Sequence, residues 1–298
     1  MGKALAEAFA PARQVFEEVD AALGERLSEA IWNGPLDRLT LTENAQPGLM
    51  AVSLAAMRVL ETEAGLDLAR DAAFVAGHSL GEYSALAAAR ALSIADAARL
   101  LRTRGRAMQK AVAVGAGAMA ALIGLELDEV KAVVAAAADT GVCAAANDNG
   151  GGQVVVSGAK AAVERAVEVA KSRGAKRAML LPVSAPFHCP LMQPAAAVMA
   201  EALAKVSLLP PVVPLIANVR AQPVKEPAEI VRCLVEQVTG TVRWRESILY
   251  MAGSSVTDFY EIGSGKVLTG LIKRIADGAT ATAIGSPEDI ARFKAARG

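Results

Sequence analysis

The segment that most constrains the fold is a Gly-x-Ser-x-Gly motif at residues 77–81. A short apolar run at residues 72–76 precedes the motif, and a helix-favouring stretch from Tyr83 to Arg90 follows it. A short apolar run bounded by glycine is typical of a buried strand. We therefore expect the chain to pass from a strand through a sharp turn directly into a helix, as in an open α/β sheet.

This turn would give Ser79 the position of a nucleophile. A sharp turn strains the backbone of the serine, and Gly77 and Gly81 would keep side chains away from its crowded faces. The helix that follows begins with free backbone N–H groups, and that of Leu80 can face a developing oxyanion. The alternative is a chance match in a turn rich in alanine and glycine, which the flanking strand and helix disfavour.

A serine nucleophile needs a base, and the chain has only two histidines, His78 and His188. Neighbouring side chains across a sharp turn point apart, so His78 is expected to brace the turn rather than to take the proton of Ser79. His188 then remains as the base. The alternative for His188 is a loop histidine that makes a structural hydrogen bond.

Composition narrows the class of protein. Hydrophobic residues make up 53% of the 298 residues, which is ample for a buried core. Lys+Arg and Asp+Glu are each 31, and this balance disfavours a nucleic-acid partner. The three cysteines, Cys143, Cys189 and Cys233, are far apart, which disfavours disulfide and metal sites.

Nothing in the sequence predicts a membrane partner. The uncharged stretch at residues 111–125 is too short for a span and is interrupted by glycines. The first 20 residues carry acidic side chains and lack the apolar centre of a secretory signal. We therefore expect a cytoplasmic protein.

The order of elements predicts two parts. Strands alternating with helices favour an α/β-hydrolase-like large domain with a mainly parallel sheet, at residues 1–117 and 184–298. Residues 118–183 follow the order βαββαβ, which predicts an inserted ferredoxin-like subdomain. The first 34 residues are expected to be helical, as are residues 48–63.

The residues around Ser79 resemble the active-site run of the malonyl-CoA:acyl carrier protein transacylases. The resemblance extends in order over nearly the whole chain, with the ferredoxin-like insert in the expected place. Its motifs are GHSLGEYSAL at residues 77–86, TRGRAMQ at 103–109, GAMAA at 117–121, QVVVSG at 153–158, PFH at 186–188 and GKVL at 265–268.

The resemblance implies transfer of a malonyl group from malonyl-CoA to the phosphopantetheine thiol of acyl carrier protein. The reaction would be ping-pong, with a malonyl-Ser79 intermediate and His188 as the base in both halves. The resemblance also implies that no metal or redox cofactor is needed and suggests a monomer. A separate chain of this size favours fatty acid synthesis over polyketide synthesis.

Further site residues follow from matching motif positions. Arg104 matches the arginine that holds the free malonyl carboxylate, whereas Arg99, Arg102 and Arg106 are expected on a solvated helix face. Phe187 resembles the residue that favours malonyl over branched methylmalonyl groups. Gln237 matches a position whose backbone carbonyl orients the histidine, although the sequence leaves Asp258 or Glu261 as competing partners.

The family normally opens with a strand and a Gly-Gln-Gly-Ser-Gln run, and the resemblance here starts just after them, at Met1. In the family, the glutamine of that run lies beside the oxyanion site and the first strand lies in the sheet. Weakening an oxyanion site costs about 10²–10³ in rate. We therefore expect this chain to be less stable and less active than a relative that carries both features.

Two rival functions remain open at the level of sequence. A serine esterase or thioesterase would use the same Ser79 and His188, and would hydrolyse malonyl-CoA without any gain from acyl carrier protein. A non-catalytic pseudo-enzyme that binds the carrier protein would form no acyl adduct. Arg104 and the ferredoxin-like insert favour the transferase.

Overall fold

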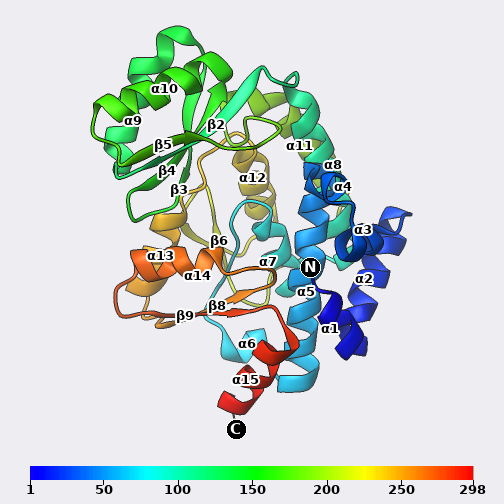
Figure 1. Cartoon of the computed structure of the whole chain (residues 1–298). Coiled ribbons are helices and arrows are strands. Elements are labelled where there is room, and N and C mark those ends of the chain that lie inside the picture. Colours follow the sequence, from blue (N-terminus) through cyan, green and yellow to red (C-terminus); the bar gives the residue numbers. More distant parts are fainter. Residues whose placement is uncertain (298) are drawn as a thin grey trace.

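Helices form the first quarter of the chain in the computed structural model, which describes residues 1–297 (Figure 1). The expectation of helix over the first 34 residues is confirmed, but three helices form, because Phe9 adopts an extended conformation and Gly24 ends a helix in the left-handed region. The helix expected at residues 48–63 begins six residues earlier. These helices are α1 (Lys3–Ala8), α2 (Ala10–Leu23), α3 (Leu27–Asn33), α4 (Leu36–Thr40), α5 (Thr42–Ala64) and α6 (Leu68–Asp71).

The strand–turn–helix arrangement around Ser79 is present. The short strand β1 (Val75–Ala76) leads through the motif into α7 (Gly81–Ala88), and α8 (Ile94–Ala111) follows. Strand β1 pairs in parallel with β6 (Leu215–Ala217), which pairs antiparallel with β7 (Gln222–Val224). The carboxyl ends of β1 and β6 therefore lie side by side, and the chain segments that leave them can meet.

The parallel strands of the large part belong to two sheets. Strands β8 (Asp258–Ile262) and β9 (Thr280–Ile284) pair in parallel with each other, separately from β1 and β6. A cavity of about 820 Å³ is lined by residues of both β1 and β8. The α/β class is confirmed, but the described strands do not form one continuous sheet. Helices of this region are α11 (Gln193–Leu203), α12 (Pro227–Gln237), α13 (Trp244–Gly253), α14 (Val267–Ile275) and α15 (Pro287–Arg297).

The βαββαβ order of the inserted segment is confirmed. Its four strands form an antiparallel sheet in the order β3-β4-β2-β5, which is the ferredoxin-like order (Figure 1, green). Helices α9 and α10 cover one face with a separate set of buried apolar side chains. The elements are β2 (Gly117–Ile123), α9 (Leu127–Ala137), β3 (Cys143–Asp148), β4 (Gln153–Ala159), α10 (Lys160–Ser172) and β5 (Arg177–Leu180).

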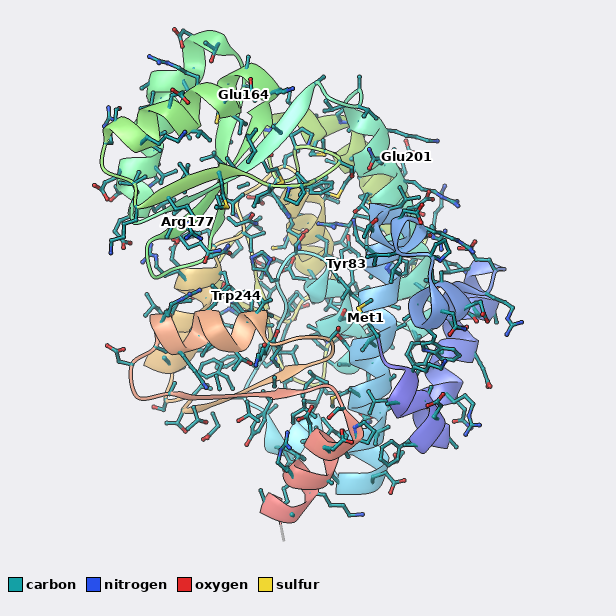
Figure 2. All side chains as sticks on the ribbon, in the orientation of Figure 1. Met1, Tyr83, Glu164, Arg177, Glu201 and Trp244 are labelled. Carbon is teal, nitrogen blue, oxygen red and sulfur yellow. The ribbon has the colours of Figure 1, made fainter. Side chains whose placement is uncertain are left out.

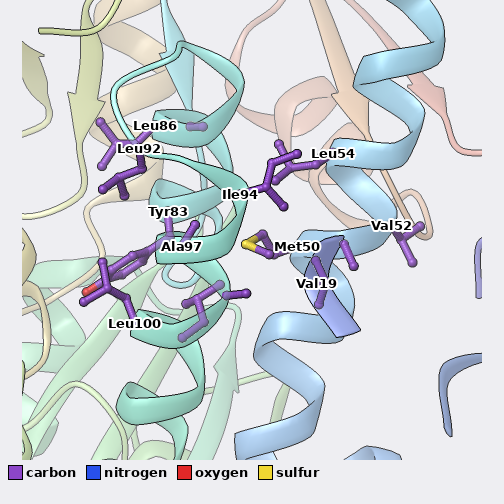
Figure 3. Packing of buried hydrophobic residues seen from close by; sticks show 14 of the residues in the cluster. Val19, Met50, Val52, Leu54, Tyr83, Leu86, Leu92, Ile94, Ala97 and Leu100 are labelled. Carbon is purple, nitrogen blue, oxygen red and sulfur yellow. The ribbon is translucent and has the colours of Figure 1, made fainter. Parts of the chain in front are cut away.

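The largest core lies among helices α2, α5, α7 and α8 (Figure 3). Tyr83 lies in the middle of the molecule, whereas Glu164 and Glu201 are exposed on its periphery (Figure 2). Helices α5 and α8 approach closely at Gly105, where an added Cβ would lie 2.5 Å from Cα of Glu43. This close approach sets the separation of two helices that carry polar residues into the site.

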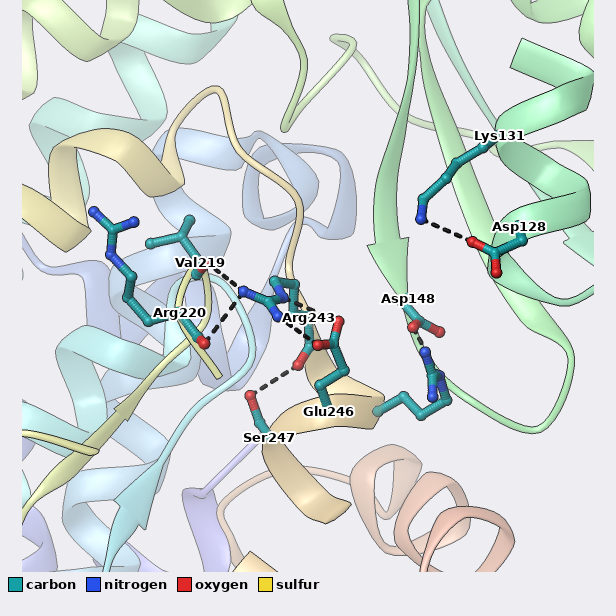
Figure 4. A network of polar contacts seen from close by, with 9 residues as sticks. Asp128, Lys131, Asp148, Val219, Arg220, Arg243, Glu246 and Ser247 are labelled. Atoms are coloured by element: carbon teal, nitrogen blue, oxygen red, sulfur yellow. Dashed lines mark hydrogen bonds and ion pairs between the residues drawn. The ribbon is translucent and has the colours of Figure 1, made fainter. Parts of the chain in front are cut away.

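Backbone hydrogen bonds join the inserted sheet to the large part. The N–H of Val242 donates to the carbonyl of Ala146 at 2.9 Å, and that of Asp148 donates to the carbonyl of Val242 at 2.9 Å. Nε of Arg245 on α13 also donates to the buried carboxylate of Asp148 at 2.8 Å (Figure 4). The last residues of β3 therefore stay in a fixed position beside the start of α13.

Candidate active site

Ser79 occupies a strained turn, as the motif predicts. Its φ is 53°, in the left-handed region that non-glycine residues rarely adopt. An added Cβ at Gly77 would lie 2.0 Å from the backbone of Gly81, so no side chain fits there. The same expectation for Gly81 is wrong, because an added Cβ at Gly81 would meet nothing among the described residues within 4 Å.

Ser79 and His188 lie in hydrogen-bond contact. Oγ of Ser79 is 2.8 Å from Nε2 of His188, and Nδ1 of His188 is 2.8 Å from the backbone carbonyl of Gln237. A carbonyl oxygen only accepts, so Nδ1 carries the proton and donates. In the neutral ring, Nε2 is then the acceptor and can take the Ser79 proton. His188 also has a left-handed φ of 57°, and its side chain is buried.

The surroundings of His188 keep its imidazole neutral. Burial, together with the nearby positive charge of Arg104, lowers the pKa of His188 to about 3. The hydrogen bond to the Gln237 carbonyl opposes this shift only in part. A base that stays unprotonated at neutral pH suits proton abstraction from a serine.

The competing acids belong to other parts of the structure. The carboxylate of Asp258 accepts from the hydroxyls of Thr257 and Thr280, each at 2.7 Å. Glu261 accepts from backbone N–H groups at the start of α14. The group bonded to Nδ1 of His188 is therefore a carbonyl, and the arrangement is a Ser–His dyad.

Arg104 reaches Ser79 from α8. Its guanidinium is 1% exposed, and Nη2 donates to Oγ of Ser79 at 3.0 Å and to Oε1 of Gln237 at 2.7 Å. Nη1 donates to Oε1 of Gln46 at 2.7 Å, whereas Nε is buried without a partner among the described residues. Burial lowers the pKa of Arg104, but an arginine retains its charge at neutral pH. A buried cation with an unused N–H is suited to bind a carboxylate.

The other arginines of α8 differ from one another in their exposure to solvent. Arg99 and Arg106 are exposed, as expected for a solvated helix face. The expectation is wrong for Arg102, which is 7% exposed and pairs with the carboxylate of Glu25. The repeat of 3.6 residues per turn places Arg102 toward α2, where this carboxylate makes its burial possible.

The remaining sequence-predicted residues surround the turn. Leu80 is the N-cap residue of α7, so its N–H lies outside the hydrogen bonds of the helix. Nε2 of His78 lies 2.9 Å from Oδ1 of Asn149, and its ring packs against Trp244. Burial lowers the pKa of His78. Phe187 is half-buried and packs against two clusters of buried apolar side chains, the large core and a small cluster that includes Met119 and Val155.

Sequence reasoning missed three buried polar residues of the site. Asn218, directly after β6, accepts the Ser79 N–H at 2.8 Å and donates to the Gly77 carbonyl at 2.8 Å, so it holds both sides of the turn. Gln46 holds Arg104, and Glu82 contacts Asn218 and Gln237. Asn218 follows the carboxyl end of β6, and polar site residues of α/β folds gather at this end of the strands.

Within residues 1–297, no cluster of histidine, cysteine and acidic side chains has the arrangement of a metal site. No helix in the same range is long and apolar enough to cross a membrane.

Comparison with known proteins agrees with this geometry. Residues 1–290 match the family model described as the acyl transferase domain. The malonyl CoA-acyl carrier protein transacylase of Escherichia coli (strain K12) is 44% identical over 287 residues, which cover 96% of this chain and 92% of that protein. The enzyme of the same name from Bacillus subtilis (strain 168) is 45% identical over 291 residues, covering 97% and 90%.

Solved structures agree as well. The acyl-carrier-protein-S-malonyltransferase of Bartonella henselae is 58% identical with a TM-score of 0.96, and the match covers 98% of this chain and 93% of that one. A malonyl-transacylase solved in complex with a type II PKS acyl-carrier protein is 38% identical with a TM-score of 0.95, and the match covers 99% of this chain and 94% of that one. The chain belongs to the acyl transferase domain family and, within it, to the malonyl CoA-acyl carrier protein transacylases.

Proposed function

We propose that this protein transfers a malonyl group from malonyl-CoA to the phosphopantetheine thiol of acyl carrier protein, with Ser79 as the acyl carrier. The observation that carries the proposal is the position of Oγ of Ser79, which lies 2.8 Å from a neutral imidazole and 3.0 Å from a buried guanidinium. The first group can take the serine proton, and the second can hold a carboxylate beside the reacting carbonyl.

In the first half-reaction, Oγ of Ser79 attacks the thioester carbonyl of malonyl-CoA while its proton moves to Nε2 of His188. The carbonyl of Gln237 stabilises the resulting imidazolium through Nδ1. The N–H of Leu80 at the start of α7 is one donor for the oxyanion. The tetrahedral intermediate collapses, the C–S bond breaks, and CoA leaves as a thiol with the proton from His188.

The second half-reaction reverses these roles. The phosphopantetheine thiol gives its proton to His188, and the sulfur attacks the malonyl-Ser79 ester. The C–O bond to Oγ then breaks, and His188 returns the proton to the serine. Because both halves pass through the same ester, the kinetics are ping-pong.

Arg104 selects the substrate. A guanidinium binds the free carboxylate of a malonyl group, whereas an acetyl group would leave this buried cation unpaired, which is costly. Phe187 lies beside the histidine and narrows the space for a branched malonyl group. His78 braces the turn through Asn149. We further propose that no metal or redox cofactor takes part, since proton transfer and electrostatics account for every step.

The proposal also covers the domain boundaries, the oligomeric state, the compartment and the pathway of the protein. Residues 118–183 form a ferredoxin-like subdomain inserted into a large α/β domain at 1–117 and 184–298, and the separate apolar cluster of the insert supports this division. The protein acts in the cytoplasm as a monomer, in fatty acid synthesis.

Intact-mass measurement tests the reaction. We expect wild-type protein mixed with malonyl-CoA to gain one malonyl group, and to lose it to holo acyl carrier protein when this is added. Ser79→Ala should gain none, because it removes the hydroxyl that lies 2.8 Å from Nε2 of His188. Free malonate formed without carrier protein would support a hydrolase instead, and absence of any adduct would support a non-catalytic binding protein.

A further inference from the structure

Glu82 is a buried carboxylate to which the proposed transfer reaction assigns no step. It lies on α7, one turn after Ser79, and its side chain is 0% exposed. Oε1 accepts the backbone N–H of Asn218 at 2.6 Å, and Oε2 accepts a hydrogen bond from Nε2 of Gln237. An acidic side chain is rarely buried this completely without a partner or a role.

The contact with Gln237 bears on Arg104. A side-chain amide has one accepting atom and one donating atom, so its orientation decides which neighbours it suits. In the structure, Oε1 of Gln237 accepts from Nη2 of Arg104 at 2.7 Å, while Nε2 donates to the Ser79 carbonyl at 2.8 Å and to Glu82. The reverse orientation would place an NH₂ group against the guanidinium, and two donors would then face each other.

We propose that Glu82 is a positioning residue for substrate selection: it fixes the orientation of the Gln237 amide and thereby holds Arg104 in place for the malonyl carboxylate. The inference rests on the proposed function, because it assigns Arg104 to that carboxylate. Glu82 contacts neither Ser79 Oγ nor the guanidinium in this arrangement and acts through Gln237.

Position 82 needs a side chain with two hydrogen-bond accepting atoms, and a carboxyl group provides them. Both of its oxygens accept here, one from Asn218 and the other from Gln237. Burial raises the pKa of Glu82 to about 8, while the hydrogen bonds and the charge of Arg104 oppose the shift. Each oxygen retains an accepting lone pair in either protonation state. A glutamine at position 82 would accept at one atom only.

The effect of Glu82→Gln is therefore specific. Its carbonyl oxygen can still accept from Asn218, whose side chain holds the turn around Ser79. Its NH₂ group then faces Nε2 of Gln237, and this contact favours the reversed Gln237 amide. The nucleophile should remain reactive while Arg104 loses its acceptor at Gln237.

The experiment compares two reactions of the same serine. Malonyl-CoA requires Arg104, whereas a fluorophosphonate probe labels an activated serine without offering a carboxylate. For Glu82→Gln, we expect KM for malonyl-CoA to rise about 10-fold, consistent with the loss of a charged hydrogen bond, with kcat and the labelling rate changed less than about two-fold. Glu82→Asp retains a carboxyl group with two accepting oxygens but is too short to bridge both donors, so its KM should rise less.

Glu261→Gln is the matched control, because Glu261 also accepts from two backbone N–H groups, at the start of α14. Its KM should match that of wild type.

If Glu82→Gln and Glu82→Asp fold and retain the wild-type KM, the role of Glu82 is refuted while the transfer reaction stands. If either variant loses labelling in proportion to malonylation, Glu82 supports the fold and not selection. If wild-type protein is labelled but never malonylated, the proposed function fails, and this inference with it.

Discussion

At the scale of single residues, the state of His188 depends on Arg104. Both groups approach the same serine oxygen, and the guanidinium remains positive at neutral pH. Burial leaves a charged imidazole poorly solvated, and the guanidinium would also repel it, so the neutral form is favoured. One cation therefore does two things: it can bind the substrate carboxylate, and it keeps the base ready to accept a proton.

This coupling predicts an unusual pH dependence. With a pKa of about 3, His188 stays neutral well below pH 6. A histidine with the ordinary pKa of about 6.5 would be about 90% protonated at pH 5.5. We expect the rate of Ser79 malonylation, measured by rapid quench and intact mass, to differ less than about two-fold between pH 5.5 and 7.0.

A roughly ten-fold loss of rate over the same interval, in protein shown by circular dichroism to remain folded, would contradict the lowered pKa. Fluorophosphonate labelling at the same pH values provides a carboxylate-free comparison, because the titration of malonyl-CoA itself cannot affect it.

At the scale of elements, the join between β1 and α7 sets the position of the nucleophile. The two glycines of the motif have different environments, although a sequence pattern treats them alike. A methyl group at Gly77 would collide with the backbone of Gly81, whereas a methyl group at Gly81 would meet open space.

The two alanine variants should therefore differ. Gly77→Ala should lower the free energy of unfolding by about 3 kcal/mol, because rigid backbone must move to admit the methyl group. Gly81→Ala should change it by less than about 1 kcal/mol, since alanine suits the first turn of a helix. Urea unfolding measures both values, and equal losses would show that the collision is not the cause.

Local patterns account for what the sequence predicted. The strand–turn–helix around Ser79 and the βαββαβ insert depend on periodicity and on turn residues within short windows, and both are present. The pairing of β1 with β6 and of β8 with β9 depends on contacts more than 20 residues apart, which periodicity does not encode. The parallel direction of these two strand pairs agrees with the mainly parallel sheet expected for the large part, whereas their division into two sheets has no local signal in the sequence.

The difference between local patterns and distant contacts also explains which site residues could be predicted from the sequence. His188 could be identified because the chain offers few histidines, and Arg104 because a family motif marks it. Glu82 lies within the motif at residues 77–86 and Asn218 lies outside the motifs, but the roles of both depend on partners 155 and 139 residues away in sequence. The burial of Arg102 has no local signal either, because its partner, Glu25, lies 77 residues away in the turn between α2 and α3.

At the scale of the whole molecule, the inserted sheet and the large part are joined next to the catalytic turn. Asp148 and Asn149 follow each other at the end of β3, and they contact Arg245 and His78 respectively. The junction therefore reaches the residue that precedes the nucleophile. A variant that weakens this junction should therefore also weaken the contact between Asn149 and His78, which supports the turn around Ser79.

The ion pair between Asp148 and Arg245 tests the strength of the junction. The Asp148 side chain is 2% exposed, so its charge has little access to water and depends on this partner. We expect Asp148→Asn to lower the free energy of unfolding by about 2 kcal/mol, because a charged hydrogen bond is lost in a buried position. Asp128 pairs with Lys131 at the same 2.8 Å, but its side chain is 92% exposed (Figure 4). Asp128→Asn should therefore leave urea unfolding unchanged, and equal effects of the two variants would show that burial does not strengthen the junction.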